Sequence, residues 1–208
     1  MAGRPRSVSD ADILHAAARV ISRVGPGALT LADVSDAVGL TPAALLRRFG
    51  SKRGLLLAVT ADGAREVAAR FAERLRIVEE GGGPAVAAVL EELCDHTEVL
   101  SRPEELANHL AFLQLDLRDA DFRQHALDYV EAERKGVRAL LEIAMRRGEL
   151  ASTTGMPADA DTLARAVQIA RHGSLLLASM RPSSDGASRL RRDVEQVLAP
   201  YRMSRNRR

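Results

Sequence analysis

The sequence predicts an all-α protein of about nine helices, and three observations support this fold class. Apolar positions recur at the three- and four-residue intervals of helices, whereas the alternation of a half-buried strand is absent. Aromatic residues make up only 3% of the 208 residues, so residue types that favour strands are scarce. Glycines and prolines divide the chain into segments of helical length.

Two short helices come first. Ser9 and Asp12 resemble a capping box, with Asp in place of the usual Glu. We expect the helix that they start to end at Gly25. Thr30 is placed to cap a second helix, which Gly39 would end.

A third helix is predicted at about residues 42–48, capped by Thr41. It is too short to be stable alone, because isolated helices under roughly 12–15 residues are marginal in water. At about 100° per residue, Leu45 and Phe49 share the face that would pack inward. The opposite face and its flanks carry Ala43, Ala44, Leu46 and Arg47. Small side chains let a helix enter a groove, and an arginine can bind guanine or phosphate. The pattern therefore predicts a helix-turn-helix, and the alternative is an ordinary corner of a helical bundle.

The charge distribution predicts where a polyanion would bind. Residues 1–55 carry eight Lys and Arg against four Asp and Glu, whereas residues 56–200 carry eighteen against twenty-four. Double-stranded DNA should therefore meet the N-terminal end. Arg4 and Arg6, on either side of a proline, suit insertion into a narrow minor groove. The alternative is that this arm is only a solvated tail.

Other classes of protein are not expected. No apolar run approaches the roughly 18 residues of a membrane span, and no secretory signal precedes the first helix. Cys94 is the only cysteine, which excludes an intrachain disulfide and fits a cytoplasmic protein. The five histidines lack the spacing of metal ligands, and no nucleophile or phosphate-loop motif occurs. We expect no enzyme activity, catalytic residue, metal, cofactor or membrane partner.

Two domains are predicted. Residues 1–53 would form a three-helix DNA-binding domain with the basic arm, and residues 54–208 a second helical domain. The apolar pattern predicts further helices at about residues 51–77, 86–100, 106–117, 119–147 and 159–180, and a last one that ends near residue 199.

The run TLADVSDAVGLTPAALLRRFGSKRGLLLAV, residues 30–59, resembles the DNA-binding signature of TetR-family transcriptional regulators. The resemblance implies a ligand-responsive regulator, in most cases a repressor that binds a palindromic operator as a homodimer and is released by a small molecule. It also implies that the second domain binds the effector and forms the dimer. The alternative is a helical protein-interaction module with a degenerate helix-turn-helix that does not bind DNA.

The resemblance assigns roles to individual residues. Thr30, Thr41 and Lys52 would contact phosphate at the starts of three helices, where an anion is favoured. Leu46 stands where the family usually has Tyr, and Arg48 could replace the phosphate contact that this change removes. Base reading would then rest on Arg47. The methyl groups of Ala43 and Ala44 could contact thymine methyls.

The second domain holds candidates for effector binding and dimerisation. Polar side chains on apolar faces are effector-site candidates, although each could instead be a satisfied core residue: His109, Tyr129 and His172. The last two helices pair between subunits in the family. Their periodic residues are the predicted dimer interface: Leu163, Val167, Ala170, Gly173, Ser174, Leu177, Leu190, Val194 and Val197. The alternative is that these residues only close the core of the monomer.

Overall fold

The computed structural model describes residues 8–94, 103–151, 159–180 and 185–202, and helices dominate these ranges. The predicted all-α fold is confirmed. The helices are α1 (Asp10–Ala28), α2 (Leu31–Val38), α3 (Pro42–Phe49), α4 (Lys52–Glu79), α5 (Ala85–Cys94), α6 (Pro103–Leu110), α7 (Phe112–Arg118), α8 (Ala120–Arg146), α9 (Ala160–Met180) and α10 (Gly186–Leu198).

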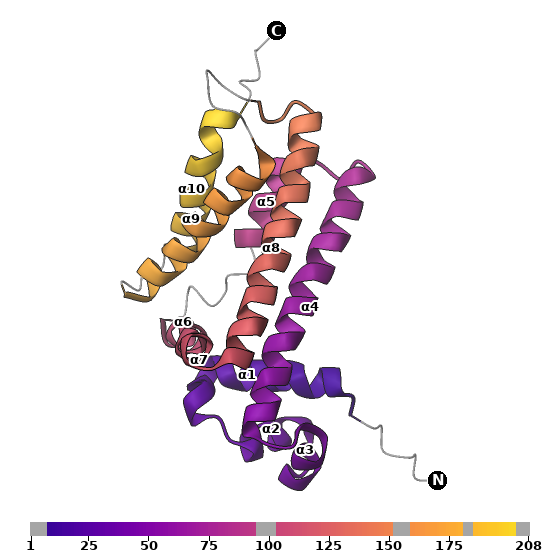
Figure 1. The fold of residues 1–208 in the computed structure, drawn as a ribbon, viewed down its shortest axis with the longest axis vertical. Coiled ribbons are helices and arrows are strands. Elements are labelled where there is room, and N and C mark those ends of the chain that lie inside the picture. Colours follow the sequence, from indigo (N-terminus) through magenta and orange to yellow (C-terminus); the bar gives the residue numbers. More distant parts are fainter. Residues whose placement is uncertain (1–7, 95–102, 152–158, 181–184, 203–208) are drawn as a thin grey trace.

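The helices α1 to α3, here called the head, lie at one end of an elongated molecule (Figure 1). Their apolar faces close a small core around Ile13, Val34 and Leu45, which are buried completely. The core continues into the body, here α4 to α10, because Leu55 of α4 and Phe122 of α8 are also part of it. The boundary between residues 53 and 54 stays a prediction.

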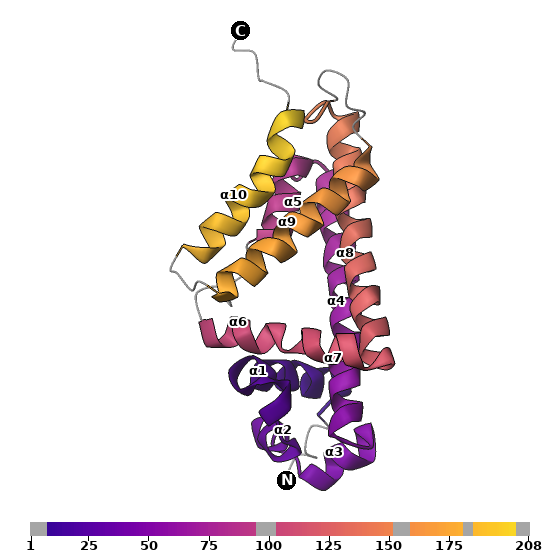
Figure 2. The ribbon, with the colours of Figure 1, turned by 60° about the vertical axis from the view of Figure 1, so that its left-hand side comes forward.

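A larger core holds the body together. It is built from the facing sides of α4, α5, α8, α9 and α10. The helices α4 and α8 lie side by side and run in the same direction (Figures 1 and 2). They approach closely at Gly136, where a Cβ atom would lie 2.1 Å from Cγ of Phe71. Only glycine permits this contact without displacing the ring.

Two predicted helices differ from the structure in detail. The helix expected at residues 106–117 is two helices, α6 and α7, interrupted at Ala111. Together they lie across α1 and separate the head from the upper body (Figure 2). The first helix kinks at Gly25, whose φ of 78° lies outside the helical region, as its predicted end there indicates.

Candidate nucleic-acid interface

The N-terminal cap of α3 and one buried side chain hold this helix in place. The Thr41 hydroxyl oxygen accepts a hydrogen bond from the Ala44 backbone N–H at 3.2 Å, and Pro42 occupies the first turn. Leu45 is buried completely, whereas the side chains of Ala43, Leu46 and Arg47 are exposed. Since one buried residue and the cap fix the helix, its opposite face remains open to a partner.

Thr30 and Thr41, at the starts of α2 and α3, differ in whether the hydroxyl proton already has an acceptor. The Thr30 hydroxyl donates to the Asp33 carboxylate at 2.6 Å, and the Asp33 backbone N–H donates back to it. The hydroxyl and the backbone N–H of Thr30 both donate to the Asp33 carboxylate, and these two bonds hold the pKa of Asp33 below its ordinary value. The Thr41 hydroxyl has no acceptor among the described residues, so its proton is available to a phosphate oxygen.

Neighbouring arginines of α3 have different surroundings. Arg48 Nη1 donates to the Val8 carbonyl oxygen at 2.7 Å and lies 3.2 Å from Asp10 Oδ1, so its guanidinium is held at the start of α1. Arg47 is exposed and forms no hydrogen bond or ion pair with any described residue. The predicted phosphate contact of Arg48 would therefore compete with an internal one, and Arg47 remains available to bases.

Lys52 connects the start of α4 with the C-terminal end of α1. Its Nζ donates to the Gly27 carbonyl oxygen at 2.6 Å. An ammonium group has three N–H donors, so two remain for an anion. The turn between α3 and α4 is tight, because a Cβ atom on Gly54 would lie 2.0 Å from the Phe49 carbonyl oxygen. This turn sets Lys52 directly after the recognition helix.

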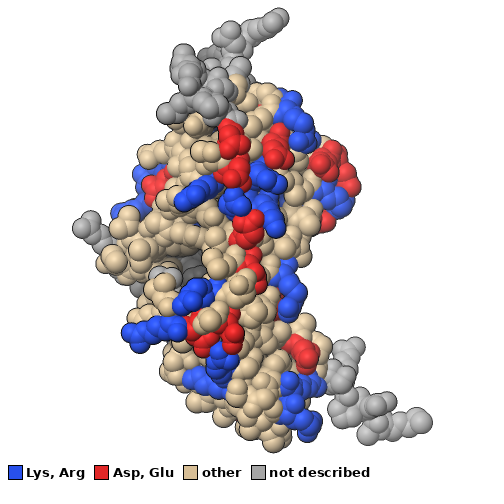
Figure 3. All heavy atoms as spheres, in the orientation of Figure 1, with Lys and Arg blue, Asp and Glu red and all other residues tan. Residues whose placement is uncertain are grey.

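Charged side chains of both signs cover the body, and basic side chains lie at the head end (Figure 3). Arg4 and Arg6 of the predicted arm lie outside the described residues. Thr30, Thr41, Arg47 and Lys52 all belong to the head or to its first connection with α4. The residues predicted for DNA contact in the described chain therefore lie at one end of the molecule.

A cluster that sequence reasoning missed lies directly behind Lys52. Arg53 forms a forked pair with Asp119, from Nε to Oδ2 at 3.1 Å and from Nη2 to Oδ1 at 2.8 Å. Its Nη2 also donates to Asp121 Oδ2 at 2.7 Å. Hydrogen bonds from Arg53 lower the pKa of Asp119. The partners lie 66 and 68 residues apart in the chain, so no local pattern indicates the pair.

The predicted effector residues occupy different surroundings. His172 Nε2 lies 3.5 Å from Oε1 of Glu133, a carboxylate that is 1% exposed. Burial lowers the pKa of His172, and the nearby Glu133 charge opposes this effect. Tyr129 is half-buried beside the body core. The side chain of His109 lies outside the described part of the structure. Tyr129 and Glu133 are four residues apart on α8 and so share a face.

Glu133 is the centre of a buried polar network that the sequence did not reveal. Its Oε2 accepts from Arg171 Nη1 at 2.9 Å, and its Oε1 accepts from Gln168 Nε2 at 3.1 Å. Arg171 Nε also donates to the Leu93 carbonyl oxygen at 3.2 Å. The network joins α5, α8 and α9.

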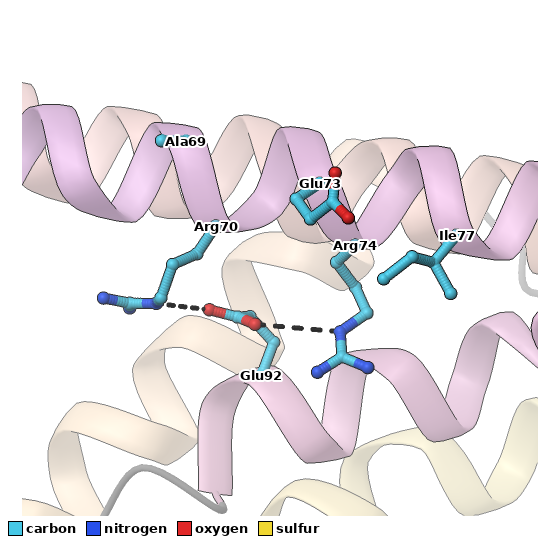
Figure 4. Close-up of a pocket in the computed structure, with 6 residues that line it drawn as sticks. All are labelled: Ala69, Arg70, Glu73, Arg74, Ile77 and Glu92. Carbon is cyan, nitrogen blue, oxygen red and sulfur yellow. Dashed lines mark hydrogen bonds and ion pairs between the residues drawn. The ribbon is translucent and has the colours of Figure 1, made fainter.

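A shallow groove of about 400 Å³ lies between α4 and α5 (Figure 4). Arg70 Nε donates to Glu92 Oε1 at 2.7 Å, and Arg74 Nε lies 3.8 Å from Glu92 Oε2. Glu92 is only 3% exposed, so the two arginines that line the groove are bound in ion pairs within the chain. None of the residues predicted for effector binding lines it.

The predicted dimer residues divide into two groups. Four fill the core of the chain itself, with 4% or less of their surface exposed, and have almost no surface for a partner: Leu163, Val167, Leu190 and Val194. Ala170 and Val197 are partly buried, and Ser174 donates to Asp193 Oδ2 within the chain. Gly173 and Leu177 are exposed.

An apolar stripe runs along the outer side of α9. Its large side chains are 62%, 42%, 65% and 68% exposed: Ile169, Leu176, Leu177 and Met180. Helical spacing places them on one face with Gly173. The sequence alone does not separate this face from the inner face of the same helix, because both are apolar.

The described ranges offer neither a cluster of metal ligands nor a membrane span. They contain no group of three or more His, Cys, Asp or Glu side chains that could hold a metal ion. No helix in them is long and apolar enough to cross a membrane.

Comparison with known proteins gives a family match in the head. Residues 13–59 match the family described as "Bacterial regulatory proteins, tetR family". No curated protein matches the chain.

Solved structures extend the likeness to the whole fold. A TetR transcription regulator from Haloarcula marismortui is 18% identical, with a TM-score of 0.72 over 93% of this chain and 98% of that one. A TetR-family regulator from Rhodococcus sp. is 23% identical, with a TM-score of 0.64 over 91% and 97%. A transcriptional regulator from Saccharomonospora viridis, solved with choline, is 18% identical, with a TM-score of 0.69 over 91% and 95%.

Proposed function

We propose that this chain is a transcriptional regulator of the TetR family that binds a palindromic DNA operator as a homodimer, supported by the family match over residues 13–59 and by the fold that it shares with such regulators. We further propose that it is a repressor, which a small molecule releases from the operator. The observation that carries the DNA-binding proposal is the exposed face of α3, where Arg47 has no partner among the described residues. Thr41 and Lys52, at the two ends of this helix, retain donors for phosphate.

The dimer proposal rests on the outer stripe of α9. Exposed large apolar side chains at helical spacing favour a second copy of the same surface, because a two-fold interface pairs a patch with itself. Gly173 would let the helices approach closely, since nothing lies within 4 Å of a Cβ atom placed there. In a dimer, the two α3 helices would meet half-sites about 34–36 Å apart.

The effector proposal rests on the polar side chains of the body. Tyr129 and the network around His172 lie among α5, α8 and α9, away from the head. A regulator of the same fold was solved with choline, which supports a small-molecule ligand for this chain. An effector that weakens operator binding must itself bind more weakly to the operator complex, by the same factor.

The experiment that tests the proposal starts from a random pool of duplexes, from which the chain selects its preferred sequence. We expect Lys52→Ala to weaken binding to all sequences alike and to lower the salt slope by about 1. The matched control is Lys135→Ala, which removes one exposed positive charge from α8. Equal effects of the two substitutions would contradict the assignment of the interface to the head. Sedimentation of the selected complex would report whether two subunits bind.

A further inference from the structure

Besides the continuous chain of α4 and the apolar core that the head shares with α4 and α8, several polar contacts tie the head and the first turn of α4 to the rest of the body. One of them is the contact of His15 Nε2 in α1 with Glu66 Oε1 in α4 at 2.6 Å. On one side, Asn108 of α6 donates from Nδ2 to the Ser22 carbonyl oxygen of α1 at 3.0 Å. On the other side, Arg53 in the first turn of α4 pairs with Asp119 and Asp121 at the start of α8. The Arg53 pair holds the start of α4, on which the head is mounted, against the start of α8, and it adjoins Lys52 of the proposed DNA surface.

The forked pair of Arg53 with Asp119 fixes the orientation of the guanidinium group as well as its distance from α8. A guanidinium group is a rigid plane, and a forked pair with a carboxylate aligns two bonds at once. The Arg53 Cζ atom also lies 5.7 Å from the centre of the Phe122 ring. Phe122 is 2% exposed and is part of the head core. Three neighbouring groups of α8 therefore hold one side chain of α4.

The surroundings of Arg53 favour an internal role over a phosphate contact. Its guanidinium already faces two carboxylates, whereas Lys52 faces one neutral carbonyl oxygen. Asp119 is itself anchored, because its Oδ1 accepts from the Asp121 backbone N–H at 3.0 Å in the first turn of α8. A phosphate near Arg53 would have to compete with two negative charges.

We propose that Arg53 is a positioning residue that sets the angle of the head on the body and thereby selects operators by the spacing of their half-sites. The proposal rests on the proposed function. In a homodimer the bodies are joined, so the angle of each head determines the separation of the two α3 helices. When Arg53 holds the head at a fixed angle, an operator with displaced half-sites binds more weakly. When the angle is free to change, such an operator binds almost as well as the selected one.

The test compares the selected operator with two variants in which one central base pair is inserted or removed, a change of about 3.4 Å along the axis. The measured quantity is the ratio of affinities for the selected and altered spacings. We expect Arg53→Met and the double variant Asp119→Asn/Asp121→Asn each to reduce this ratio about fivefold or more. The asparagines keep the capping oxygen of α8 and lie on the body, outside the proposed DNA surface.

Two further variants separate positioning from other effects. Arg53→Lys keeps the charge and loses the fork, so it should also reduce the ratio while the salt slope stays unchanged. Arg65→Met removes an exposed ion pair of α4 with Asp62, which joins no second helix, and should leave the ratio unchanged. Thermal melting of each variant reports whether it is folded.

Other results would overturn the inference. Equal weakening at every spacing, with a salt slope lowered by about 1, would make Arg53 a phosphate contact. An unchanged ratio in Arg53→Met and in the aspartate variant would exclude a positioning role. If the unaltered chain selected no duplex, the proposed function would fail, and this inference with it.

Discussion

Arg47 of the head and the buried carboxylates of the body have opposite surroundings. In the head, Arg47 is left exposed without an internal partner, on the face of α3 that is turned away from the core. In the body, the buried carboxylates of Glu92 and Glu133 are each paired with arginines from other helices. A buried charge must be paired to be tolerated, whereas an exposed one is free for an external anion. Buried charge thus joins helices in the body, whereas the exposed Arg47 of the head is available for binding.

The largest expected effect concerns the body. Glu133→Ala would leave Arg171 and Gln168 without their shared acceptor, and we expect the free energy of unfolding to fall by about 3–5 kcal/mol. Urea denaturation would measure it. The control is Glu131→Ala on the same helix, where an exposed pair with Arg134 should contribute about 1 kcal/mol or less. If Glu133→Ala and Glu131→Ala lost equal free energy of unfolding, the buried ion pair would contribute no more to stability than the exposed one.

An intermediate effect is expected in the head, on binding and not on folding. Arg47→Ala should weaken operator binding by about 1–3 kcal/mol and relax its sequence preference. Its melting temperature should stay unchanged, because the side chain contacts nothing internal. Arg48→Ala is the matched neighbour, and it should affect binding less, since its guanidinium is held by Val8 and Asp10. Operator titration shows which arginine binds DNA, and a larger effect of Arg48→Ala would reverse the assignment.

The smallest effect is a dependence of stability on pH. The pKa of His172 is lowered by burial, so the folded chain binds its proton less tightly than the unfolded chain does. Its contribution to stability is therefore present above the unfolded pKa of about 6.5 and is lost as the pH falls through the folded value. Melting temperatures between pH 8 and 5 should decline less steeply for His172→Asn. A steeper decline for His172→Asn than for the unaltered chain would mean that folding raises the pKa of His172 and does not lower it.

Local sequence patterns predicted the head more fully than the body. The N-cap residues of α1 to α3 and the buried position of Leu45 follow from spacing over a few residues, and the structure confirms them. The body depends on pairings between distant segments, such as Arg53 with Asp119, which have no local signature. On α9, two apolar faces lie on one helix. Periodicity predicted a set of residues that mixes the two faces, with Gly173 and Leu177 on the outer stripe, and only the packed structure separates them.

The contact between Phe71 and Gly136 has a mechanical consequence. A ring seated against a glycine resists sliding, because movement along α8 would bring the side chains of neighbouring residues against it. We therefore expect α4 and α8 to turn together as one lever about the level of this contact, which is its pivot. Lys52 lies nineteen residues before Phe71, which is roughly 28 Å along a helix. A rotation of about 5° would then displace the DNA end by about 2.5 Å, so a small repacking at the pivot is enlarged where the operator would lie.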